Sequence, residues 1–145
     1  MGLFSCELMW KIILTSLFGF ALVVVISLPF VSFGFSKEDM NIGRVRADCV
    51  SIHSALTAYA EKGSRPPTTE QGLEALVGRP TSEPLPEDWV QLAIRMPLDP
   101  WKQPYRYREL ATDGRLFRWE VRSAGPDGIA GNEDDLAEES EWRVR

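Results

Sequence analysis

The hydrophobic pattern of the chain begins with a run of apolar and small residues that carries no charge, Ile12 to Phe35. At about 1.5 Å of rise per residue, a helix of this length can cross the hydrocarbon core of a bilayer. Lys11 and Lys37 flank the run with charges that can reach the interface. A buried core helix of this length would need apolar neighbours on every side, and a chain of 145 residues is too short to supply them. The pattern therefore predicts a short leader and a transmembrane helix within residues 1–36.

After this run, apolar residues recur every three or four positions, which is the period of an amphipathic helix. The stripe consists of Val45, Cys49, Ile52, Leu56 and Tyr59. Gly63 follows the stripe, as is common where a helix ends. The spacing predicts a helix over residues 37–62 that buries one face. If Pro29, Gly34 and Gly43 only bend the chain, this helix continues that of the membrane run.

A capping pair predicts a second, shorter helix. Thr68 and Gln71 have the spacing at which two side chains bond each other's backbone N–H groups at a helix start. The apolar residues that follow recur at helical spacing, so we expect a helix over residues 69–77. Prolines are frequent over residues 78–100, and this segment is predicted to be an irregular loop.

Strand-forming residues dominate from residue 104 onward. Two such runs flank the turn at Asp113, and together they predict a β-hairpin over residues 104–123. In the second run Trp119 and Val121 alternate with charged residues, as in a strand with one buried face. Trp142 and Val144 could pack a last strand against this sheet. We therefore expect residues 37–145 to form one α+β head domain, in which a long helix packs on a small antiparallel sheet.

Composition excludes several classes of function. The formal net charge is −5 and the acidic residues gather toward the C-terminus, which argues against a nucleic-acid partner. The single histidine, His53, lies beside the apolar stripe, and no hydroxyl or thiol stands in a recognisable nucleophile motif, so we expect no enzymatic activity. Cys6 and Cys49 are separated by the whole hydrophobic run, which makes a disulfide between them geometrically implausible.

An acidic, glycine-rich loop is predicted over residues 123–136. Its glycines allow sharp turns that can aim carbonyl oxygens inward. Asp127, Asp134 and Asp135 supply hard anionic oxygens, the ligands that calcium prefers. The spacing of these residues is not that of an EF-hand. From the residues alone, the loop is either a calcium site or a solvated acidic loop.

The first seven residues also allow two interpretations. Glu7 stands one helical turn before Lys11, so the two side chains can pair at the membrane interface. Alternatively, Gly2, Leu3 and Glu7 resemble the processing site of type IV pilin-like proteins, in which a prepilin peptidase cuts after the glycine and methylates the new N-terminus. In those proteins the glutamate is thought to pair with the terminal amine of a neighbouring subunit during assembly.

Three segments of the head carry a more specific resemblance. They are PTTEQGLEALV from Pro67, MPLDPWKQPYRY from Met96, and the Ser-x-Gly-x-Asp-Gly pattern from Ser123. All three are similar to segments of the major pseudopilins of the type II secretion system. The resemblance is dense over residues 48–142, while the first 47 residues agree in plan and only thinly in sequence.

The resemblance implies a type IV pilin-like fold and a particular set of site residues. It implies that the acidic loop binds calcium through the side chains of Asp127, Asp134 and Asp135 and the backbone carbonyl of Ala124. It also implies that Gly2, Leu3 and Glu7 serve in processing and assembly.

The function that the resemblance implies is structural. The chain would be a subunit of a type II secretion pseudopilus, held in the bacterial inner membrane by a single span with its C-terminal domain in the periplasm. Subunits would polymerise with one another, with other pseudopilins and on an inner-membrane assembly platform, and the filament would drive exoprotein export through the secretin. The alternative is a permanently membrane-anchored, calcium-binding periplasmic interaction domain that does not polymerise.

Overall fold

The computed structural model describes residues 36–144 of the chain. Its elements are α2 (Lys37–Gly63), α3 (Glu74–Val77), β1 (Arg106–Thr112), β2 (Leu116–Ser123) and β3 (Leu136–Arg143). This combination confirms the predicted α+β class. Among the described residues, no helix has the length and apolar character needed to cross a membrane. The predicted membrane run and the predicted processing residues Gly2, Leu3 and Glu7 lie outside the described residues.

Helix α2 begins with a capping box at Ser36. The Ser36 hydroxyl accepts a hydrogen bond of 3.0 Å from the Asp39 backbone N–H, and the Asp39 carboxylate accepts one of 3.0 Å from the Ser36 N–H. Ser36 itself is extended, with ψ of 156°, and α2 begins after it. The predicted join to the helix of the membrane run involves residues outside the described part of the chain. At the other end, Ser64 adopts a left-handed conformation that ends the helix one residue beyond the predicted range.

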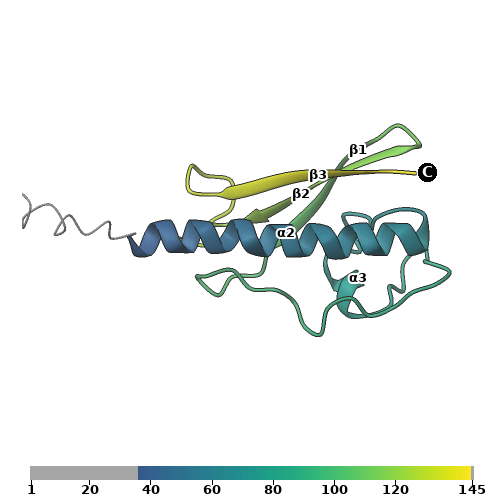
Figure 1. The fold of residues 1–145 in the computed structure, drawn as a ribbon, viewed down its shortest axis with the longest axis horizontal. Coiled ribbons are helices and arrows are strands. Elements are labelled where there is room, and N and C mark those ends of the chain that lie inside the picture. Colours follow the sequence, from purple (N-terminus) through teal and green to yellow (C-terminus); the bar gives the residue numbers. More distant parts are fainter. Residues whose placement is uncertain (1–35, 145) are drawn as a thin grey trace, which may run out of the picture. The chain divides into compact units, whose positions relative to one another are not determined.

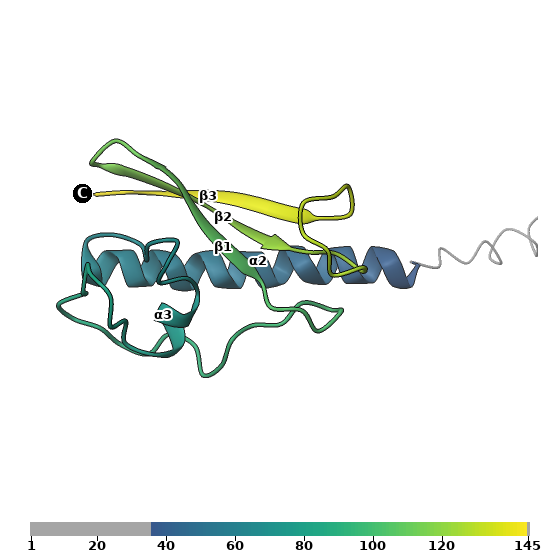
Figure 2. The same cartoon turned by 180° about the vertical axis from the view of Figure 1, so that it is seen from behind.

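The three strands form one antiparallel sheet in the order β1-β2-β3. β2 lies in the middle, where Arg122 pairs with Arg106 of β1 and Phe117 pairs with Trp142 of β3. In Figures 1 and 2 the sheet lies above α2, whereas α3 lies below the helix. The acidic loop joins β2 to β3 at the end of the sheet nearest the start of α2 (Figure 1).

The core lies where the apolar stripe of α2 meets the sheet. All five predicted stripe residues are buried. Trp119 on β2 has 0% exposure and is the largest fully buried side chain among the described residues. Cys49 of the stripe is a free thiol, and burial, followed by the nearby charge of Glu138 on β3, raises its pKa to about 11.

The second helix is shorter than the predicted range of 69–77. The Thr68 and Gln71 capping pair forms as expected, with reciprocal hydrogen bonds of 3.0 and 3.2 Å. However, Gly72 has φ of +60°, which an α-helix does not allow, so residues 69–73 form turns and only Glu74–Val77 is helical. The sequence did not reveal this break, because a glycine can adopt either a helical or a left-handed backbone.

The proline-rich segment is irregular in structure but firmly attached. The backbone N–H groups of Leu92 and Ala93 both donate to the Leu76 carbonyl over 2.9 Å. The Trp89 indole N–H donates to the Ala75 carbonyl over 2.8 Å. These bonds satisfy carbonyls at the C-terminal end of α3, which its four residues cannot satisfy within the helix.

His53 has a partner in the core that its position in the sequence did not indicate. The Trp119 indole N–H donates a 2.9 Å hydrogen bond to His53 Nδ1. This bond needs the neutral form of the imidazole, because a protonated Nδ1 cannot accept. Burial lowers the pKa of His53, an effect that the carboxylate of Glu138 opposes.

We therefore expect the stability of the head to fall as pH is lowered through about 6.5, the pKa of an unfolded histidine. Below that pH the unfolded chain binds a proton that the folded chain resists, so the free energy of unfolding decreases by at most about 1.4 kcal/mol per pH unit from this group. Melting curves at pH 5 to 7.5 test this, with His53→Asn as the comparison because its side-chain oxygen can accept the Trp119 bond without titrating. A wild-type slope equal to that of His53→Asn would contradict the assignment.

Candidate functional site

The acidic loop is organised first by Asp127, one of the predicted calcium ligands. Its Oδ1 accepts the backbone N–H of Ile129 over 2.7 Å, a turn in which an aspartate bonds the backbone two residues ahead. Its Oδ2 accepts the side-chain amide of Asn132, also over 2.7 Å. Asp127 therefore closes the tip of the loop with both carboxylate oxygens.

Asp134 lies against Gly125, so the two sides of the loop approach closely there. Gly125 has φ of +65°, and a Cβ at this position would lie 2.5 Å from the Asp134 carbonyl oxygen and 2.6 Å from its Oδ2. Only glycine fits this contact. The Asp134 carboxylate is also 3.5 Å from the backbone nitrogen of Asp127. Ala124, whose carbonyl completes the predicted donor set, is buried beside Gly125.

Asp135 turns toward β2. Its Oδ2 accepts hydrogen bonds of 2.8 Å from the backbone N–H of Gly131 and from Nη1 of Arg122. These two contacts, that of Gly131 first, lower the pKa of the Asp135 carboxyl. The Asp135 side chain is only 5% exposed, and its Oδ1 is buried without a hydrogen-bond partner. Arg122 was not among the predicted site residues, since nothing in the sequence links it to a residue 13 positions away.

The predicted donors match calcium in their chemistry. They are hard oxygens, and the buried Oδ1 of Asp135 is an acceptor that still lacks a partner. The structure brings Asp127 and Asp134 close together, while Asp135 points to Arg122. Within residues 36–144, no three His, Cys, Asp or Glu side chains are grouped so that they could hold a metal ion. Calcium binding by this loop therefore stays a prediction.

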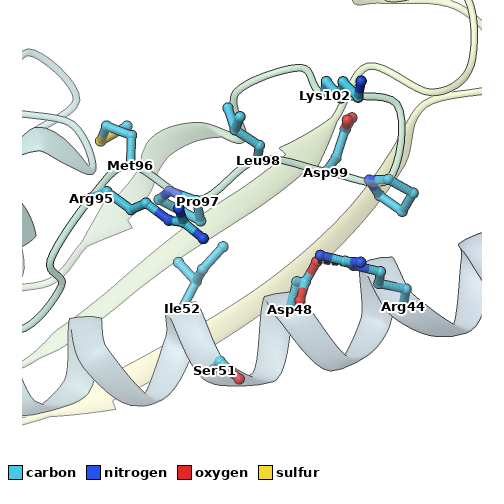
Figure 3. Close-up of a pocket in the computed structure, with 11 residues that line it drawn as sticks. Arg44, Asp48, Ser51, Ile52, Arg95, Met96, Pro97, Leu98, Asp99 and Lys102 are labelled. Carbon is cyan, nitrogen blue, oxygen red and sulfur yellow. Dashed lines mark ion pairs between the residues drawn. The ribbon is translucent and has the colours of Figure 1, made fainter.

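A groove of about 540 Å³ lies between α2 and the segment around residues 95–102 (Figure 3). Side chains of both signs line it: Arg44, Asp48, Arg95, Asp99 and Lys102. Asp48 pairs with Arg44 over 3.5 Å and accepts the Tyr105 hydroxyl over 3.0 Å. Ser51, also in the lining, donates its hydroxyl to the Ala47 carbonyl, so this hydroxyl is engaged within α2. Asp48 and Ser51 therefore use their polar side-chain atoms in bonds that hold the head together.

Asp99 fastens the wall of this groove to the sheet. It is 3% exposed, and its Oδ1 accepts the backbone N–H groups of Trp101 and Gln103 over 3.0 and 2.8 Å. Its Oδ2 accepts the hydroxyl of Ser123, the last residue of β2, over 2.6 Å. The sequence did not indicate this bond, because Ser123 lies 24 residues further along the chain.

Comparison with known proteins identifies the family of this chain. A family model described as "Type II secretion system (T2SS), protein G" matches residues 35–142, which is most of the chain. The chain belongs to the type II secretion system protein G family. The family predicted from the resemblance is therefore confirmed.

Relatives in the protein G family are similar over most of the chain. Type II secretion system core protein G of Pectobacterium carotovorum subsp. carotovorum is 39% identical over 103 residues, which is 70% of this chain and 64% of that protein. The Aeromonas hydrophila protein of the same name is 35% identical over 112 residues, 76% of this chain and 74% of that protein. The alignment thus spans about two thirds to three quarters of these relatives.

A solved structure is also similar. The crystal structure of the major pseudopilin from the type 2 secretion system of enterohaemorrhagic Escherichia coli superposes with a TM-score of 0.62 at 36% identity. The match covers 70% of this chain and 88% of the Escherichia coli chain. The head described here therefore has the fold of a protein G family pseudopilin.

Proposed function

We propose that this chain is a structural subunit of a type II secretion pseudopilus that polymerises from the inner membrane and drives exoprotein export through the secretin. The observation that carries the proposal is the protein G family match over residues 35–142. In the groove, Asp48 and Ser51 use their side chains in hydrogen bonds within the head, which agrees with a structural role.

The proposed subunit has one membrane span and a periplasmic head. The uncharged run Ile12–Phe35 is the proposed span, and α2 begins two residues later at Lys37. In the membrane the apolar run faces lipid, and in the filament the same surface can face the runs of neighbouring subunits. Glu7 would be costly to bury there without a partner, which supports its pairing with the terminal amine of an adjacent subunit.

The proposed partners are other copies of this chain, other pseudopilins and an inner-membrane assembly platform. A prepilin peptidase is the proposed processing enzyme, which would cut between Gly2 and Leu3. No nucleic-acid partner is proposed, because the net charge is −5.

The mature N-terminus tests this function. We expect mass measurement of the membrane-extracted protein to show loss of Met1 and Gly2 and a methylated Leu3, and we expect the mature chain to sediment as filaments when the secretion system is present. Glu7→Gln should leave processing intact and abolish sedimentation, whereas Glu38→Gln, an exposed carboxylate in the first turn of α2, should change neither. An intact Met1 with no sedimenting material would favour the permanently anchored domain instead.

We also propose that the acidic loop binds calcium. Asp127, Asp134 and the Ala124 carbonyl are the proposed donors, and the unpartnered Oδ1 of Asp135 supports a role for that residue. When bound, calcium would neutralise these carboxylates and hold the two sides of the loop together. Gly125, with its left-handed backbone, keeps the close approach that this loop needs.

A further inference from the structure

Arg122 of β2 forms the contacts that tie the acidic loop to the sheet. Its Nη1 donates to Asp135 over 2.8 Å. Its Nε and Nη2 donate to the two oxygens of Glu120 over 3.1 and 3.2 Å. One guanidinium therefore binds a strand carboxylate with two bonds and a loop carboxylate with a third, a geometry that lysine cannot reproduce.

The carboxylates that Arg122 binds are both shielded from water. The side chain of Asp135 is 5% exposed and that of Glu120 is 10% exposed, while that of Arg122 keeps 30%. A shielded carboxylate needs a nearby cation or donor, since burying the charge alone is costly. Arg122 supplies that positive charge from within the chain. One of the carboxylates that it binds, Asp135, is also a proposed calcium ligand.

A second cation at Asp135 would meet the charge of Arg122. Two positive charges a few ångströms apart repel, and the repulsion is strongest where water is excluded. Only Oδ1 of Asp135 remains without a partner, because Oδ2 is shared by Arg122 and Gly131. A divalent ion therefore either displaces Arg122 from Asp135 or binds next to it with a weakened affinity.

We propose that Arg122 is the internal counter-cation of the acidic loop, and that it sets how far the stability of the head depends on calcium. Arg122 holds Asp135 on β2 without a metal, so calcium contributes less to this chain than it would if Arg122 were absent. The claim that Arg122 competes with calcium rests on the calcium binding proposed above. The claim that Arg122 anchors Asp135 rests on the Arg122 contacts alone.

The test measures the melting temperature of the full chain in detergent, by tryptophan fluorescence, with calcium or with a chelator. Arg122→Gln is expected to melt about 5 °C or more below wild type in chelator, because Asp135 then lacks its cation. It is also expected to recover more of its stability in calcium than wild type gains, and to bind calcium about tenfold more tightly in a calorimetric titration. Arg118→Gln is the matched control, since Arg118 lies on the same strand and pairs with the exposed Glu139 over 2.8 Å.

Several outcomes would overturn the proposal. If Arg122→Gln melts in chelator at the same temperature as Arg118→Gln, Arg122 does not anchor the loop. If calcium stabilises wild type and Arg122→Gln equally, Arg122 does not compete with the metal, although the loop still binds calcium. If calcium stabilises neither, the competition and the calcium site both fail, while the proposed role in the filament is judged separately from the mature N-terminus.

If Arg122→Gln does not fold, Asp135→Asn still tests whether Arg122 and calcium compete for Asp135. This substitution removes the carboxylate that needs a cation and leaves Arg122 bonded to Glu120. The variant is expected to melt at the same temperature in calcium and in chelator. A calcium response as large as that of wild type would show that Asp135 is not the residue for which Arg122 and calcium compete.

Discussion

Trp119→Ala is expected to reduce the free energy of unfolding by about 3–5 kcal/mol, the largest loss expected from a single substitution in this head. Trp119 has 0% exposure on the central strand, so its removal leaves a cavity bounded by α2 and the sheet. The substitution also removes the donor to His53 Nδ1, whose ring has a second nitrogen already buried without a partner. Urea denaturation of the detergent-solubilised chain measures the loss.

A graded set of controls locates this effect in the core. Trp142→Ala removes the same side chain from β3, where it is only partly buried against Phe117, so a smaller loss is expected. Val50→Ala alters an exposed residue of α2 and should stay within about 0.5 kcal/mol of wild type. If Trp119→Ala cost no more than Trp142→Ala, the packing of α2 on β2 described above would be wrong.

Asp99→Ala is expected to destabilise the head by about 3 kcal/mol, although the residue lies in a segment without helix or strand. Its removal leaves two partly buried backbone N–H groups and the buried Ser123 hydroxyl without their acceptor. A buried polar group left unsatisfied costs about 1–3 kcal/mol, the costs add incompletely, and the two partly buried groups cost less. Denaturation curves of wild type and Asp99→Ala give the difference in the free energy of unfolding. Hydrogen exchange should accelerate at Trp101 and Gln103, whose amides lose their partner.

Two further variants separate the loss of these bonds from general damage. Asp99→Asn keeps one carbonyl acceptor and should lose less stability than the alanine variant. Asp88→Ala removes an exposed carboxylate from the same proline-rich segment and should be nearly neutral. A neutral Asp99→Ala would mean that the Asp99 contacts do not hold the groove wall to β2.

The features that could be predicted from the sequence are those with a local period or a local bond. The stripe of α2 follows the 3.6-residue period, so the spacing of Val45 to Tyr59 was enough to assign these residues to one buried face. The hairpin was predictable because the strand of Trp119 and Val121 alternates and a turn precedes it. The glycines and aspartates that follow the second strand-forming run likewise indicated a loop.

The features that were missed depend on contacts between distant residues. The bond from Trp119 to His53 joins positions 66 residues apart, and the bond from Ser123 to Asp99 joins positions 24 apart. No periodicity encodes such pairs, because they arise only after the sheet has packed on α2. The partnership of Arg122 and Asp135 was missed for the same reason, although both ends of the loop were correctly placed.

The capping box at Ser36 has a consequence for how independently the head folds. Ser36 and Asp39 satisfy each other at the start of α2, so two backbone N–H groups at this end of the helix find their acceptors within the described residues. The start of α2 is therefore specified by residues of the head itself. Residues 36–144 are therefore expected to keep their fold whichever environment the proposed membrane run occupies.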